Sequence, residues 1–559
     1  MRGNRLIIAI DYGTTFTGVA FCETSDTGVV GKTIILIQDW PCRNTRIATK
    51  DKVPSELALK DFANWGSLIA PNEQRHMWTK LLLDDPKAGE VDKIMRELSL
   101  SSDQGSSAKP VEIIAKYLAH IKAHTIKNLD IHYGKGLWRT LPLTLVVTVP
   151  AVWSDAAKHS TLQAVDKAGF NNIELPQLKR IVLTTEPEAA AIYTIQSMRG
   201  GIQDDQFAVG DGFIVCDMGG GTVDLISYRV AELDPTTLEE ATVGSGDQCG
   251  GSFVERGFMK CLERRLGTAD FISIAGERSE DLPRTSLSPK LSRMVQDFVM
   301  EVKTGFSGHE TSFLRLPVPL SSVEDDEARG IQDGEIMITP ADIKEMFEFP
   351  LRRTYELLLE QIVQARRTGN VKLKFVFMVG GFSESPYMYE KIKLFAESHG
   401  LVAIRPAHAW SAIVRGAAAK GLEGDGRAQI TNRKCRRHYG TQIRNVFVAG
   451  QHDEADGSRC SFTGIKMATK QMMWLLDKGQ DLSSKSESHA YSDLRVFTVA
   501  TLVVDLSGVP QSAYEACTSI SGGAYYELNI KIEMIIQSSL EFSLLVKGVR
   551  YGAVTATYA

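Results

Sequence analysis

Four apolar runs along the chain have the length and the β-branched content of buried strands. Each run is ended by a proline, glycine or aspartate, residues that interrupt regular structure. The runs are residues 6–10, 143–149, 213–218 and 374–379. They predict strands that lie in the interior of the protein.

Helical patterns lie between these runs. Residues 157–169 (AKHSTLQAVDKAG) and 354–369 (TYELLLEQIVQARRTG) are two examples, and each closes on a glycine, as helices often do. Strands that alternate with helices are typical of an α/β architecture. The chain up to about residue 424 is therefore predicted to be α/β.

The pattern changes after Gly424. Residues 424–440 are polar, basic and punctuated by glycine, which suits an exposed connector. This segment contains the basic residues Arg433, Lys434, Arg436 and Arg437. They either bind an acidic partner or, more simply, are solvated. Residues 494–506, 525–537 and 540–558 are strand-like. We therefore expect a separate β-rich module in this part of the chain.

Composition narrows the class of protein. A chain of 559 residues is too long for one compact core, and 43% hydrophobic and 23% charged residues are ordinary for a soluble protein,. The net charge of −5 argues against a general nucleic-acid binder. The eight cysteines form no CxxC pair, which fits a reducing compartment. The apolar run near the N-terminus stops at Asp11, too early for a secretory signal or a membrane span, so we expect a cytoplasmic protein.

One loop plan occurs twice. Residues 7–21 (IIAIDYGTTFTGVAF) and 214–228 (IVCDMGGGTVDLISY) each contain an apolar strand, an aspartate, a Gly/Thr loop and a second apolar strand. Either copy alone could be a plain hairpin turn, because Gly and Asp tolerate the backbone angles of tight turns. Two copies that face each other would form a phosphate clamp, because glycines let backbone N–H groups approach an anion closely.

The aspartate of each copy, Asp11 or Asp217, would repel a phosphate. Its presence is explained if a hard cation such as Mg²⁺, with its water shell, lies between carboxylate and phosphate. The sequence does not contain the GxxxxGK[ST] loop of the P-loop enzymes,.

A third loop, within residues 375–392, runs from a buried strand through Gly380 and Gly381 into a helix. Backbone without side chains at this turn permits a base or ribose to approach closely. Ser383 and Ser385 offer hydroxyl groups near the start of the helix. The structural alternative is that one of these serines only caps the helix.

These three loops, in this order, resemble the actin-like ATPase superfamily and in particular the heat shock protein 70 family. Residues 148–170, 184–195 and 411–422 are similar to the family's strand–proline–helix segment and its two hinge helices. The resemblance covers about residues 5–423 and is greater to divergent heat-shock-like proteins than to the standard chaperones. It implies two ribonuclease-H-like lobes around a nucleotide cleft.

The resemblance also implies a domain plan. Residues 1–205 would form the first ATPase lobe, and residues 206–423 the second lobe with the returning hinge helix. Residues 424–559 would form a degenerate peptide-binding-like β module without the helical lid. The small residues of the hinge helices let them cross closely, which suits either lobe closure or simply tight packing.

By resemblance, Asp11 and Asp217 would hold the water shell of Mg²⁺, and Lys80, Glu186 and Asp217 would be catalytic. The residues that would bind ATP or ADP are Gly13, Thr14, Thr15, Gly219, Gly220, Gly221, Thr222, Asp224, Gly250, Gly251, Lys303, Gly380, Gly381 and Ser383. Two alternatives concern single residues. Lys80 could be a solvated helix lysine, and Glu186 could be an acid that only complements a helix dipole.

Two departures from the family pattern affect the base and ribose side. Family members usually carry an aspartate before the second hinge helix, where this chain has Trp410 and Ser411. The adenine-side helix corresponds to residues 298–308. There Lys303 and Ser307 match, Glu301 matches only with a slip in register, and no arginine matches.

The function implied is that of an ATP-binding chaperone-like protein with slow, Mg²⁺-dependent hydrolysis. Hydrolysis would switch lobe closure and the binding of a polypeptide or protein partner, for instance by strand addition to the C-terminal module. A nucleotide-gated scaffold with little hydrolysis is the first alternative. A small-molecule kinase is the second alternative, because sugar kinases share this superfamily fold and fold alone does not fix function. It ranks last, because no catalytic base beyond Glu186 is identified and the β-rich C-terminal part resembles the chaperone branch.

Overall fold

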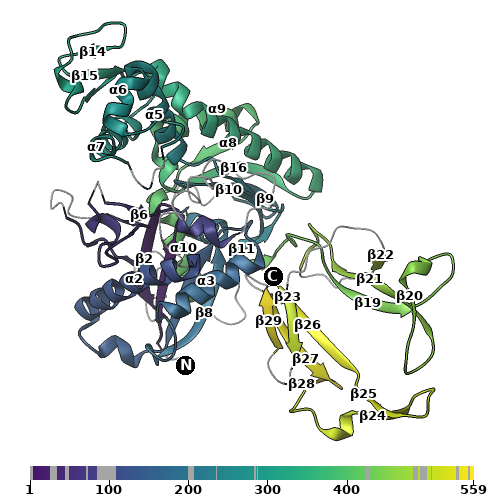
Figure 1. The fold of residues 1–559 in the computed structure, drawn as a ribbon. Helices are drawn as coiled ribbons and strands as arrows, with labels where there is room; N and C mark the ends of the chain where they lie inside the picture. Colours follow the sequence, from purple (N-terminus) through teal and green to yellow (C-terminus); the bar gives the residue numbers. More distant parts are fainter. Residues whose placement is uncertain are drawn as a thin grey trace. The chain divides into compact units, whose positions relative to one another are not determined.

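The computed structural model describes residues 4–24, 34–43, 50–70, 73–84, 109–198, 207–233, 236–282, 285, 287–423, 429–482, 489–491, 500–504, 506–536, 540–551 and 554–558. The chain forms two compact units, residues 1–431 and 432–559 (Figure 1). The predicted boundaries after residues 205 and 423 fall at residues outside the described ranges, so the division into two lobes and a module stays a prediction.

The first sheet is built around β1 (Leu6–Tyr12), in which every residue is buried. Its strand order is β3-β2-β1-β7-β8, and β4 pairs with β2. β1 and β2 form an antiparallel hairpin, whereas β1, β7 and β8 are parallel. The other strands are β2 (Phe16–Glu23), β3 (Ile35–Leu36), β4 (Val53–Pro54), β7 (Leu143–Val149) and β8 (Leu178–Thr185).

The second sheet repeats this plan around β9 (Asp211–Met218), which is also completely buried. The order is β17-β16-β9-β10-β11-β18, and β12 pairs with β10. β9 and β10 form an antiparallel hairpin, and β9, β16 and β17 are parallel. The remaining strands are β10 (Val223–Leu233), β11 (Thr236–Glu240), β12 (Ser245–Asp247), β16 (Lys372–Val379), β17 (Val402–Ile404) and β18 (Ile430–Asn432). Two sheets of this kind are typical of the lobes of actin-like ATPases, so the predicted fold class is confirmed.

Helices lie against the sheets; α8, for example, runs beside β16, and α9 lies against β17 and α8 (Figure 1). The α-helices are α2 (Pro110–Tyr133), α3 (Asp155–Lys167), α4 (Glu186–Met198), α5 (Ser252–Leu266), α6 (Thr268–Ala275), α7 (Pro289–Asp297), α8 (Pro340–Thr368), α9 (Pro386–Ser398) and α10 (Ala412–Leu422). Short elements include β5 (Leu57–Ala58), β6 (Arg75–His76), the 3-10 turns η3 (Thr79–Leu83), η9 (Gly381–Glu384) and η10 (Ala409–Ser411), and the π-helix η7 (Phe298–Lys303). A small sheet consists of β13 (Ser312–Arg315), β14 (Ile331–Gln332) and β15 (Glu335–Ile338).

The predicted helix over residues 354–369 is the second half of α8, which runs from Pro340 to Thr368 and is followed by Gly369 in the left-handed conformation. Its start is a capping box. The Thr339 hydroxyl accepts the N–H of Asp342 at 3.2 Å, and the Asp342 carboxylate accepts the N–H of Thr339 at 3.0 Å. The helix continues through the buried Pro350, which the sequence pattern alone does not anticipate.

Replacement of Thr339 with alanine is expected to lower the free energy of unfolding by about 1 kcal/mol, because one N–H of the first helical turn loses its acceptor. The measurement is urea unfolding followed by circular dichroism. Thr368→Ala is the control, since the Thr368 hydroxyl only donates back to the carbonyl of Ala365 in the same helix. Equal losses for the two variants would contradict a capping role for Thr339.

The two predicted hinge helices, α4 and α10, cross in close contact. A Cβ on Gly416 would overlap the backbone carbonyl of Ala189, well inside the 3.0 Å that real Cβ atoms keep. Lys420 of α10 forms an ion pair with Glu188 of α4 at 3.1 Å. Small residues are therefore required where these helices cross.

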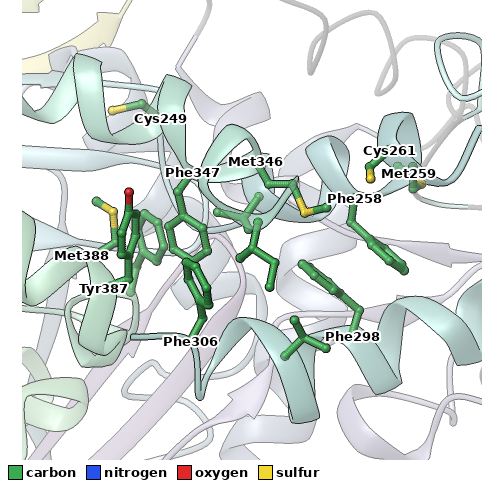
Figure 2. Close-up of a cluster of buried hydrophobic side chains, with 14 of the residues drawn as sticks. Cys249, Phe258, Met259, Cys261, Phe298, Phe306, Met346, Phe347, Tyr387 and Met388 are labelled. Atoms are coloured by element: carbon green, nitrogen blue, oxygen red, sulfur yellow. The ribbon is translucent and has the colours of Figure 1, made fainter. Parts of the chain in front are cut away.

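The core behind the second sheet is aromatic. Phe258 and Phe298 stack with their ring centroids 4.1 Å apart, and Phe306, Phe347 and Tyr387 form a second group (Figure 2). Because Phe298 begins η7 and Tyr387 lies at the start of α9, this cluster fixes the helix that carries the predicted residue Lys303 and the helix that follows the third loop.

Residues 432–559 contain antiparallel sheets, as the strand-like pattern predicted. The strands are β19 (Tyr439–Val446), β20 (Gly457–Arg459), β21 (Lys466–Leu476), β22 (His489–Tyr491), β23 (Ala500–Val504), β24 (Glu515–Thr518), β25 (Ala524–Glu527), β26 (Ile530–Ile536), β27 (Leu540–Val546), β28 (Val549–Tyr551) and β29 (Val554–Tyr558). None of the helices in the described ranges is long and apolar enough to cross a lipid bilayer.

The prediction of an exposed connector is wrong for its second half. Cys435 is completely buried against Tyr439, and Lys434 forms an ion pair with Asp481 at 2.7 Å. A single small cysteine among basic residues gives no apolar periodicity, so the sequence did not reveal this contact. Residues 424–428 of the predicted connector lie outside the described residues.

Candidate functional site

The two repeated loops lie face to face. Each is closed by the same turn, in which Gly13 N–H donates to Phe16 O at 3.2 Å and Gly219 N–H donates to Thr222 O at 2.9 Å. A Cβ on Gly221 would lie 2.7 Å from Cγ2 of Thr14. In the same way, a Cβ on Gly220 would overlap the Thr15 side chain. We call this pair of loops, residues 13–15 and 219–222, the hairpin site.

A further glycine pair supports the second hairpin from behind. Gly250 N–H donates to Gly221 O at 3.0 Å, and Gly251 N–H donates to Gly219 O at 3.1 Å. A Cβ on Gly250 would lie 2.6 Å from Gly219 O. These N–H groups therefore hold the hairpin in place, and contact of Gly250 and Gly251 with a ribose stays a prediction.

The third loop reaches the hairpin site because β9 and β16 are parallel and end together, with Val379 beside Asp217. Gly380 has φ of +82°, and a Cβ there would lie 2.5 Å from Oδ1 of Asp217. Only glycine can adopt this positive φ and lie so close to the Asp217 carboxylate without strain. The buried Ser383 hydroxyl donates to Gly380 O at 2.6 Å, and Ser385 is the N-cap of α9. The capping alternative thus holds for Ser385.

Asp11 is buried at the end of β1, and both of its carboxylate oxygens have partners. Lys52 Nζ lies 2.6 Å from Oδ2, and the Thr148 hydroxyl donates to Oδ1 at 2.8 Å. Burial alone would raise the pKa of Asp11, but Lys52 and Lys80 outweigh it and lower the pKa. Sequence reasoning missed Lys52, because a lone lysine before a short strand belongs to no motif.

Lys80 lies in η3 and forms a buried ion pair with Glu186, the first residue of α4. The Trp153 ring lies 5.6 Å from the Lys80 ammonium. Burial would lower the pKa of Lys80, but Glu186 and Asp11 outweigh it and raise the pKa, so the ammonium stays charged. The alternative of a solvated helix lysine is therefore wrong. Glu186 does open a helix, so the dipole interpretation and a role in the site are both compatible with its position.

Asp217 and Asp224 are directly opposite each other across the second hairpin, and both are buried. Oδ1 of Asp217 has no hydrogen-bond partner among the described residues. Burial raises the pKa of Asp217 well above its ordinary range, and Glu186 and Asp224 add to this. Burial, followed by Glu186, raises the pKa of Asp224 to about 7.

The buried charges of the site do not balance. In the described part of this site, the buried carboxyl groups outnumber the buried ammonium groups by two. The carboxyl groups are those of Asp11, Glu186, Asp217 and Asp224, and the ammonium groups are those of Lys52 and Lys80. A divalent cation would restore neutrality and supply a partner for Asp217. No three His, Cys, Asp or Glu side chains in the described ranges converge closely enough to hold a metal directly. Mg²⁺ fits these residues if water and phosphate oxygens complete its coordination.

The predicted base and ribose side is built differently from the family pattern. Lys303, the last residue of η7, pairs with Glu255 of α5 at 3.1 Å, whereas Glu301 is exposed. The π-helix explains the slip in register, because each of its turns holds one residue more than an α-helix. Ser307 bonds to Glu310. Glu255 gave no sequence signal, because its partner lies on a different helix.

Comparison with known proteins agrees with this fold. The Hsp70 protein family model matches residues 91–430, and the chain belongs to the Hsp70 family as a divergent member. It is 23% identical over 518 residues to heat shock 70 kDa protein 12A of Homo sapiens, covering 80% of this chain and 73% of that protein. The identity and both coverages are the same for heat shock 70 kDa protein 12A of Mus musculus. The chain is also 23% identical over 521 residues to heat shock 70 kDa protein 12B of Homo sapiens, covering 80% of this chain and 72% of that protein. Hsp70 proteins bind ATP with Mg²⁺ and are ATPases in general, so ATP binding is implied for this chain.

Proposed function

We propose that the hairpin site binds Mg·ATP and hydrolyses it slowly, and that hydrolysis switches the binding of a polypeptide or protein partner. The observation that carries this proposal is the pair of facing glycine hairpins, with two more buried carboxyl groups than ammonium groups behind them. A polyphosphate is bound by backbone N–H donors and by a cation that neutralises its charge. The two hairpins offer the N–H donors, and the surplus of buried carboxyl groups suits a cation.

Each group of residues in the site has a separate role in binding and hydrolysis. The N–H groups of residues 14–15 and 220–222 would bind the β- and γ-phosphates, whereas those of Gly13 and Gly219 close the two turns. When bound, Mg²⁺ supplies positive charge for the phosphate oxygens, and Asp11 and Asp217 hold its water shell. Lys80 leaves Glu186 for the γ-phosphate and stabilises the charge that develops there. Glu186, released from Lys80, accepts a hydrogen bond from the attacking water and orients it.

Lobe closure would follow from binding, since a ligand that contacts both hairpins favours the state in which they are close. The crossing of α4 and α10 at Gly416 is the natural hinge. The module of residues 432–559 would receive the partner, for instance by addition of an extended strand to an exposed sheet edge.

A nucleotide-gated scaffold that hardly hydrolyses ATP is the second candidate. It is favoured by Asp11, both of whose oxygens are already engaged by Lys52 and Thr148, and by Trp410 in place of the family's aspartate. A small-molecule kinase ranks behind both, because no base beyond Glu186 is identified for a substrate hydroxyl.

The test is calorimetric titration of the full chain with ATP, with Mg²⁺ or with EDTA. Asp217→Asn is expected to weaken Mg²⁺-dependent binding by about 10–100-fold, the effect of removing a group that orients a metal's water shell. Asp166→Asn, an exposed aspartate of α3, should bind as the wild type does. Binding that ignores both Mg²⁺ and Asp217 would refute the proposed site.

A further inference from the structure

Trp410 occupies a defined place beside the third loop. Its segment is fixed to the loop by the N–H of Gly380, which donates to Ala409 O at 3.0 Å. A Cβ on Gly381 would lie 3.0 Å from both Cδ1 and Nε1 of the indole. Gly381 therefore lies in tight contact with the Trp410 ring, which is half-buried.

Phe16 brings a second ring to the same place from the first hairpin. It directly follows Thr15, and its side chain is 36% exposed. The rings of Phe16 and Trp410 meet edge to face, with centroids 5.6 Å apart and planes at 84°. An aromatic surface thus joins the first hairpin to the third loop, next to the residues proposed to bind phosphate.

Three polar side chains of the third loop and of the predicted base and ribose side are already bonded within the protein. Lys303 pairs with Glu255, and the Ser383 hydroxyl donates to Gly380 O. Arg405 donates to the carbonyl oxygens of Ser383 and Glu384 at 3.2 and 3.3 Å. These groups are poorly placed to read the hydrogen-bonding edge of a base. Stacking on an aromatic ring does not require hydrogen bonds to the edge of the base, because every base has a π-face.

We propose that Trp410, supported by Phe16, is the stacking surface for the nucleobase, and that the site accepts adenine and guanine nucleotides with little discrimination. This inference rests on the proposed function and adds its base specificity. Trp410 would act by direct contact with the ligand, so its removal should affect nucleotides that carry a base and spare a bare polyphosphate.

The experiment measures dissociation constants of Mg·ATP, Mg·GTP and Mg·tripolyphosphate by calorimetry on the full chain. For the wild type, ATP and GTP should agree within about threefold. Trp410→Ala should weaken both nucleotides by roughly 5–150-fold, the loss of one stacked base, and leave tripolyphosphate unchanged. Trp410→Phe should keep most of the affinity. Trp474→Ala, in residues 432–559, is the matched control.

The outcomes separate the two proposals. Retained tripolyphosphate binding proves that a Trp410 variant is folded. The inference is overturned if Trp410→Ala leaves ATP and GTP binding unchanged, if it weakens tripolyphosphate equally, or if the wild type prefers ATP more than about a hundredfold. A wild type that binds ATP but shows one of these results keeps the proposed function. A wild type that binds none of the three ligands refutes both.

Discussion

Lys80→Ala is expected to lower the single-turnover rate of ATP hydrolysis by about 10²–10³ while changing the affinity for Mg·ATP only slightly. The Lys80 ammonium is buried and close to Glu186, and the second buried lysine of the site, Lys52, is engaged by Asp11. No other buried ammonium in the described part of the site is free to replace Lys80 at the γ-phosphate. Phosphate release from radiolabelled ATP in excess enzyme is the measurement.

Removal of Lys80 leaves Glu186 buried without its cation, which costs stability. The double variant Lys80→Met/Glu186→Gln removes both charges, so no unpaired charge is left buried. We expect this variant to fold and to serve as the comparison for Lys80→Ala. Lys60→Ala, an exposed lysine, is the control and should hydrolyse ATP at the wild-type rate. Unchanged hydrolysis in both Lys80 variants would show that this lysine takes no part in the reaction.

Gly416→Ala is expected to cost about 3 kcal/mol of stability, although it adds one methyl group. The added Cβ would overlap the carbonyl of Ala189 in the crossing helix, and backbone cannot move aside as a flexible side chain does. The two hinge helices would have to separate. The midpoint of thermal unfolding, followed by circular dichroism, should fall clearly below that of the wild type.

Gly305→Ala provides the matched control, because the nearest atom to a Cβ there is Glu301 O at 3.8 Å. Its unfolding midpoint should stay close to that of the wild type. If the two glycine variants unfold alike, the close crossing of α4 and α10 does not contribute to stability.

Local features of the site were predictable from the sequence. The strand–Asp–Gly/Thr–strand plan at Asp11 and Asp217 fixes a hairpin by short-range chemistry, and the repeat itself suggested that the copies face each other. The structure places Thr14 against Gly221 and Gly380 against Asp217, so the three loops do meet.

Two of the unpredicted features depend on partners distant in sequence. Lys52 contacts Asp11 from the residue just before β4, and Glu255 contacts Lys303 from another helix. A single charged residue carries no pattern that reveals its partner. The π-helix at η7 shifts the register of its side chains in a way that helical periodicity does not reveal. Cys435 is buried beside Tyr439 although its neighbours are basic.

Single-turnover hydrolysis of Mg·ATP by the purified full chain, with Asp217→Asn as the control, tests the central claim most directly. The account predicts slow phosphate release that requires Mg²⁺ and that Asp217→Asn removes. Tight Mg·ATP binding without phosphate release would contradict the ATPase and leave the nucleotide-gated scaffold. Phosphate release that persists in Asp217→Asn would place the chemistry outside the facing hairpins.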